Sequence, residues 1–142
     1  MFADFELQAH RLVEEGRPVT ADTLNGIYAT LLRDYYGDVL DEEEISRVTW
    51  ARIPHFFSTP YYVYQYATCF ASTARLMQAI RSTDAATREA GVERYLSLLR
   101  AGGSDYPMNL LARAGVDLSQ PDTVRAVTTE LDTLVGRLEA EL

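Results

Sequence analysis

Hydrophobic residues recur along the chain at intervals of three and four positions, which is the period of one face of an α-helix. Polar N-cap residues, acidic first turns and closing glycines divide this pattern into separate helices. The predicted helices run from Phe2 to Val13, Thr20 to Gly37, Asp41 to Trp50, Tyr61 to Ser82, Asp84 to Arg100, Asp105 to Gly115 and Ser119 to Leu138. No stretch alternates as a half-buried strand does, and no Gly-rich phosphate loop or internal repeat occurs. We therefore predict an all-α, bundle-like chain that forms a single helical domain over residues 1–142.

The central segment 53–60, IPHFFSTP, interrupts the helical pattern. Pro60 suits the first position of the next helix, with Ser58 or Thr59 as its cap. Further along, Cys69 is predicted to be a buried, unreactive thiol, and Gly91 could interrupt its helix. In the first of these helices one apolar stripe is predicted, and in the second a set of buried residues. The stripe consists of Val63, Ala67, Phe70, Ala74 and Met77, and the buried residues are Tyr95, Leu96, Leu98 and Leu99.

Composition narrows the possible partners. The net charge of −8 and pI near 4.7 argue against binding to nucleic acid or to anionic membranes. No apolar run reaches the roughly 18 to 20 residues of a membrane span, and the N-terminus lacks the features of a secretory signal. We therefore expect a cytoplasmic protein.

Candidate chemistry is concentrated in one place. The sequence contains neither HExxH nor CxxC, so no usual zinc site is predicted. Carboxylate pairs at Asp4 and Glu6, Glu14 and Glu15, and in the run 41–44 are interpreted as solvated helix faces. His10 is interpreted as a structural or surface histidine. His55 differs because it stands in the interrupting segment, just ahead of a run of tyrosines, and loops held by rigid elements often carry function.

Four tyrosines follow within a few residues: Tyr61, Tyr62, Tyr64 and Tyr66. Phenol hydroxyls are costly to bury without partners and are useful hydrogen-bond donors. The cluster is therefore either an aromatic packing seam or the polarising wall of an active site. On a helix beginning at Tyr61, the Tyr61–Tyr64 pair would share one face and the Tyr62–Tyr66 pair another. Only one of these pairs could readily face a cleft.

Several segments together resemble the C-terminal portion of the oligoendopeptidase F family: MFADFEL, WARIPHFF, YYVYQYATCFAS and YLSLLRAGGSDYPMNLLARAGVD. These enzymes are zinc metallopeptidases of the thimet-oligopeptidase type. The resemblance implies a largely helical, bowl-shaped enzyme that cleaves short peptides in a deep channel. In the family, zinc is held by the HExxH histidines and a glutamate on a following helix. Those elements lie upstream of the region that this chain resembles.

The resemblance also implies roles for individual residues. His55 corresponds to the family's loop histidine. Tyr64 first, and Tyr61 second, correspond to the tyrosines that donate hydrogen bonds to the tetrahedral intermediate, while Tyr62 and Tyr66 are assigned to substrate binding. Zinc is the cofactor of the family, but this chain alone has no metal ligands and is expected to bind none.

Three hypotheses remain open at this point. The chain could be a piece of an oligopeptidase that works with a complementary zinc-bearing chain, a stand-alone helical module that binds peptides or proteins, or a degenerate product without activity. We expect the isolated chain to fold without hydrolysing peptides. We also expect it to self-associate, because helices that belong to a larger body expose apolar surface.

Overall fold

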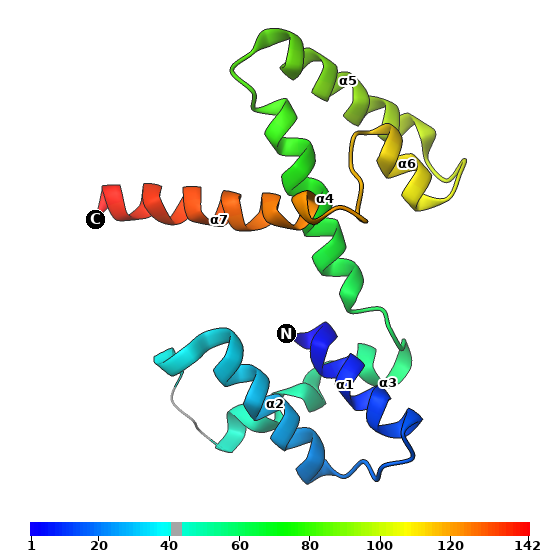
Figure 1. The fold of residues 1–142 in the computed structure, drawn as a ribbon, viewed down its shortest axis with the longest axis vertical. Coiled ribbons are helices and arrows are strands. Elements are labelled where there is room, and N and C mark those ends of the chain that lie inside the picture. Colours follow the sequence, from blue (N-terminus) through cyan, green and yellow to red (C-terminus); the bar gives the residue numbers. More distant parts are fainter. Residues whose placement is uncertain (41–43) are drawn as a thin grey trace. The chain divides into compact units, whose positions relative to one another are not determined.

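The computed structural model describes residues 1–40 and 44–142, and every regular element in that part of the chain is helical (Figure 1). This confirms the predicted all-α fold. In order, the elements are α1 (Phe2–Glu14), α2 (Ala21–Tyr36), the 3₁₀ helices η1 (Gly37–Val39) and η2 (Glu44–Arg52), α3 (His55–Ser58), α4 (Tyr64–Ile80), α5 (Ala85–Ala101), α6 (Pro107–Arg113) and α7 (Pro121–Glu141). Among the described residues, none of these helices has the length and hydrophobicity to cross a membrane.

The chain folds as two compact units, residues 1–65 and residues 66–142, here called unit 1 and unit 2. The single domain expected over residues 1–142 stays a prediction. Of the acidic run 41–44, residues 41–43 lie outside the described part of the chain. The helical continuation through Trp50 is confirmed, although η2 is a 3₁₀ helix.

Unit 1 is built around an aromatic core. Its most buried members are Phe5 of α1 with Tyr28 and Leu31 of α2, and Met1, Leu24, Ile27, Leu32, Trp50 and Phe56 pack around them. The caps predicted for α2 are confirmed, since Thr20 Oγ1 accepts a hydrogen bond from the Thr23 N–H (3.2 Å) and Gly37 ends the helix. The indole Nε1 of Trp50 donates to Asn25 Oδ1 at 2.8 Å, which ties η2 to α2.

The helix predicted to begin at Tyr61 begins at Tyr64 instead. A short helix, α3, already occupies His55–Ser58, and Pro60 lies in a turn rather than at a first helical position. Tyr61 has a φ of 58°, in the left-handed region, so the chain reverses there before α4 starts. Tyr61 also contacts α1, which is distant in sequence, and local helix signals do not contain that contact.

Unit 2 contains α4 to α7, and it confirms the predicted caps. Asp84 Oδ2 accepts the Thr87 N–H at 2.8 Å at the start of α5. Pro107 and Pro121 occupy the first turns of α6 and α7, as the signals before each helix indicate. Gly91 does not interrupt α5. It is buried in the middle of the helix and faces Ala79 of α4.

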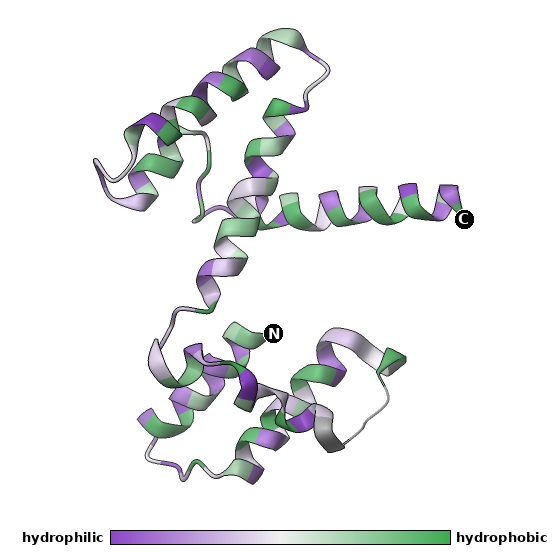
Figure 2. Cartoon of the chain, turned by 180° about the vertical axis from the view of Figure 1, so that it is seen from behind, coloured by the Kyte–Doolittle hydropathy of each residue, from purple (hydrophilic) through white to green (hydrophobic). Residues whose placement is uncertain are grey.

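The predicted apolar and buried positions around α4 and α5 are confirmed only in part. Val63 is buried, Ala74 and Met77 are half-buried, and several others are wrong. Phe70, Tyr95 and Leu99 are exposed, at 73%, 38% and 59% of their surface, and Cys69 is exposed as well. Ala67 is exposed too, and Leu96 and Leu98 are only half-buried. The residues that are buried are small or medium in size: Ala71, Ser72, Gly91, Leu110, Ala114, Val116, Thr123 and Ala126. Periodicity identified apolar faces, but unit 2 has no element that covers most of them. Figure 2 shows hydrophobic residues repeated along α7 toward the C-terminus.

Candidate functional site

The segment that carries His55 and the tyrosines links α3 to α4. His55 is the first residue of α3, directly after its N-cap residue Pro54. Its imidazole stacks on the ring of Tyr62, with the ring centroids 5.2 Å apart and the planes 3° from parallel. A second local bond fixes the turn, because the Tyr62 N–H donates to the carbonyl oxygen of Thr59 at 3.2 Å. The histidine and one tyrosine are thus held together before α4 begins.

Tyr61 contacts two residues of α1. Its backbone N–H donates to the Glu6 carboxylate, with 2.7 Å between N and Oε1. Its ring lies against the imidazole of His10, with centroids 4.4 Å apart. The two histidines of the chain therefore contact neighbouring tyrosines: His10 contacts Tyr61, and His55 contacts Tyr62.

The prediction that the four tyrosines form two pairs on two faces of one helix is wrong, because they do not all lie in one helix. Tyr61 and Tyr62 precede α4, whereas Tyr64 and Tyr66 lie in its first turn. All four side chains are partly exposed, at 42%, 39%, 49% and 54% in sequence order. An aromatic packing seam would bury these rings, so that interpretation does not fit the described structure.

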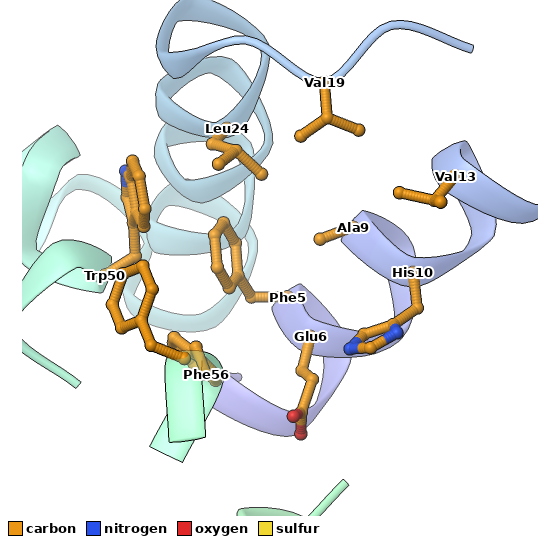
Figure 3. A pocket seen from close by; sticks show the side chains of 10 residues that line it. Phe5, Glu6, Ala9, His10, Val13, Val19, Leu24, Trp50 and Phe56 are labelled. Atoms are coloured by element: carbon orange, nitrogen blue, oxygen red, sulfur yellow. The ribbon is translucent and has the colours of Figure 1, made fainter. Parts of the chain in front are cut away.

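A hydrophobic cavity of about 170 Å³ lies beside this segment within unit 1 (Figure 3). Aromatic side chains of η2 and α3 face α1 across it, and its lining is Phe5, Glu6, Ala9, His10, Val13, Val19, Leu24, Trp50, Phe56 and Phe57. Glu6 and His10 are its polar members. Both residues also contact Tyr61. The same two side chains of α1 therefore line the cavity and hold the tyrosine segment.

Glu6 is the residue that the sequence interpretation missed. It was expected on a solvated face with Asp4, but only 3% of its surface is exposed. A signal was available, because Glu6 falls between Phe2, Phe5, Ala9 and Val13 on the apolar stripe of α1. A carboxylate at such a position is normally buried with a partner. Here the partner is the backbone of Tyr61.

The described residues do not fit a zinc ion held by this chain alone. No group of three His, Cys, Asp or Glu side chains within residues 1–40 and 44–142 is arranged to hold a metal. Zinc sites in enzymes use three such protein ligands. No chemical step through a metal is therefore derived from these residues.

The sequence model of Peptidase family M3 matches residues 1–128. The chain belongs to this family. Group B oligopeptidase PepB of Streptococcus agalactiae is 40% identical over 143 residues, covering 96% of this chain and 23% of that protein. An oligoendopeptidase F homolog of Borreliella burgdorferi is also 40% identical, over 124 residues that cover 87% of this chain and 20% of that protein.

A solved structure of another protein has a similar fold. The crystal structure of a chain described as a candidate peptidase of Chlamydophila abortus superposes with a TM-score of 0.86 at 30% identity. That match covers 99% of this chain and 23% of the other. The chain thus spans about a fifth of the length of its M3 relatives. The resemblance to oligoendopeptidase F is confirmed.

Proposed function

We propose that this chain supplies hydrogen-bond donors and part of the substrate channel for the hydrolysis of short peptides by an M3 peptidase. One observation carries the proposal: in a chain that belongs to this family, His55 stacks on the partly exposed ring of Tyr62, and the partly exposed Tyr61 and Tyr64 are its neighbours in the segment that leads into α4. The partly exposed phenol of Tyr64 can be reached by a substrate, whereas a ring buried in a core cannot.

The proposed chemistry is electrostatic stabilisation. When a peptide carbonyl is attacked, its oxygen becomes an oxyanion, and donors aimed at that position lower the barrier. We assign Tyr64 as the first donor and Tyr61 as the second. The stack between His55 and Tyr62 restricts both rings, so that His55 can donate from a defined direction. Tyr62 and Tyr66 contribute contacts to the peptide. One such donor is typically worth about 3 to 4 kcal/mol of transition-state stabilisation.

The isolated chain is proposed to be inactive. Because its described residues do not form a metal site, we propose that a complementary polypeptide provides the zinc ligands of the family. Metal analysis and a fluorogenic peptide assay on the purified chain test this. Zinc bound at about one equivalent together with peptide cleavage would overturn it.

The role of the tyrosines is tested by mixing this chain with the upstream, zinc-bearing part of an M3 relative. If activity appears, Tyr64→Phe should lower kcat by about 100-fold or more while KM changes little, because the donor acts on the transition state. Tyr106→Phe is the matched control, since Tyr106 is a 79% exposed tyrosine outside the segment that carries His55 and the tyrosine run. Unchanged turnover in Tyr64→Phe would remove Tyr64 from the proposed site.

A second candidate function is a stand-alone module that binds a peptide or a protein without catalysis. The exposed apolar face of α7 favours it, because such a face commonly marks an interaction surface. The two functions differ in one measurement. Binding of peptide by the isolated chain, with no turnover after the zinc-bearing part is added, supports the module and contradicts the peptidase role.

A further inference from the structure

The buried carboxylate of Glu6 has no role in the sequence-based assignment of the site. Only 3% of Glu6 is exposed, and charged side chains are rarely buried to this extent unless they are paired. The carboxylate accepts the backbone N–H of Tyr61 over 2.7 Å, a bond between residues 55 positions apart in the sequence. Hydrogen bonds to a charged acceptor are shorter and stronger than neutral ones.

The residue that Glu6 holds has an unusual backbone. Tyr61 is the only non-glycine residue with positive φ in the described part of the chain, at 58°. Aromatic residues seldom adopt this conformation, and it persists only where the surroundings impose it. α1 contacts Tyr61 twice, through the Glu6 carboxylate on its N–H and through the His10 ring on its phenol ring.

The conformation of Tyr61 sets the direction in which the chain enters α4. The next residue, Tyr62, stacks on His55 within 3° of parallel, and Tyr64 opens α4. A Tyr61 with negative φ would send the chain in another direction and separate these groups. Tyr61 therefore connects the residues of α1 that hold it to the neighbouring side chains assigned to the site.

We propose that Glu6 is a positioning residue: its buried carboxylate holds Tyr61 left-handed and thereby orients Tyr62 against His55 and the start of α4. The consequence for catalysis rests on the proposed function. The structural consequence does not, so the two are tested separately. Glu6 contacts no substrate in this scheme and acts only through Tyr61.

NMR on the full chain tests the structural part. A residue with positive φ gives a strong intraresidue NOE between its amide and Hα protons, and the stacked rings of His55 and Tyr62 give mutual NOEs. Glu6→Gln keeps an acceptor oxygen and should retain both signals. Glu6→Leu should weaken both and speed amide exchange at Tyr61 by about tenfold or more, as expected for loss of a charged acceptor. Glu14→Leu is the matched control, because Glu14 is an exposed glutamate on the same helix.

A rescue variant separates positioning from general destabilisation. Glycine adopts positive φ without strain, so Tyr61→Gly in the Glu6→Leu background should restore the NOEs between His55 and Tyr62. Persistence of the Tyr61 signature in Glu6→Leu, or failure of glycine to restore the stack in a folded double variant, would overturn the proposal.

Turnover in the reconstituted peptidase then tests the catalytic consequence. Glu6→Leu should lower kcat by about tenfold with little change in KM, and Glu6→Gln should stay within about twofold of the unmodified chain. NMR changes without a change in turnover would leave the positioning role intact and contradict the assignment of this segment to catalysis. Failure of the Tyr64→Phe test contradicts the proposed function alone.

Discussion

At the scale of single residues, three aspartates organise the turns of unit 2. Each stands shortly before a helix: Asp84 before α5, Asp105 before α6 and Asp117 before α7. Hydrogen bonds to the carboxylate, first from the side chain of Thr87, Asn109 or Ser119 and then from backbone N–H groups, lower the pKa of each aspartate. Arg113 also pairs with Asp105 at 2.7 Å. The ionised form of each group therefore supports the helix start.

These lowered pKa values predict that unit 2 loses stability in acid. An aspartate whose pKa is lower in the folded state stabilises the fold above its unfolded pKa, near 3.8 here, and this stability is lost as the pH falls through the folded pKa. The urea midpoint should therefore drop as the pH falls from about 5 toward 3.

The control is a variant with Asp84, Asp105 and Asp117 replaced by asparagine, which can still cap helices but does not titrate. Its urea midpoint should depend less on pH over the same range. An equally steep dependence in this variant would assign the acid sensitivity to other carboxylates.

At the scale of elements, unit 2 depends on the close approach of α4 and α5. Gly91 allows it: a Cβ placed there would lie 3.0 Å from the Ala79 carbonyl carbon and 3.0 Å from its Cβ. Glycine is normally a poor helix residue by about 1 kcal/mol relative to alanine. Its presence in the middle of α5 is therefore explained by packing rather than by helix propensity.

Gly91→Ala should destabilise the chain despite its better helix propensity. Overpacking against the α4 backbone costs about 1 to 3 kcal/mol, which meets or exceeds the propensity gain of about 1 kcal/mol. Urea unfolding measures the difference.

Gly136→Ala is the matched control, because Gly136 also lies within a helix of unit 2 but an added Cβ would meet nothing within 4 Å. It should stabilise the chain by up to about 1 kcal/mol. Equal stabilisation by both substitutions would show that α4 and α5 are not in close contact at Gly91.

At the scale of the whole molecule, the last helix presents an apolar face that the other helices of unit 2 leave exposed. Every residue from Leu131 to Leu142 is exposed. The exposed hydrophobic residues of α7 are Val124, Leu131, Leu134, Val135 and Leu138, and they lie on one side of the helix. Such a face favours association with another surface.

We predict that the purified chain self-associates through this face. Light scattering across a range of concentrations should show a mass that rises with concentration, and Leu131→Lys should shift it toward the monomer. Thr133→Lys places the same charge on the opposite side of α7 and should leave association unchanged. A monomer at all concentrations would contradict the prediction.

The sequence by itself determined that the chain is helical and where most of its longer helices begin and end, because these features depend on neighbours within a few positions. Thr20 and Asp84 cap their helices as predicted, and Pro107 and Pro121 open theirs. The segments that resemble oligoendopeptidase F also identified the family correctly. Caps, first-turn prolines and family-specific segments are all formed by residues close together in the sequence, so they can be read from one sequence.

The tertiary structure decided which faces are buried and where α4 begins. The buried Glu6 and the left-handed Tyr61 are joined by a hydrogen bond between residues 55 positions apart, which no local pattern encodes. Likewise, periodicity marks a face as apolar, but only a neighbouring element can cover it, and Phe70 and Leu99 stay exposed. Local propensity acts through bonds along the chain, whereas burial depends on which distant segments pack together.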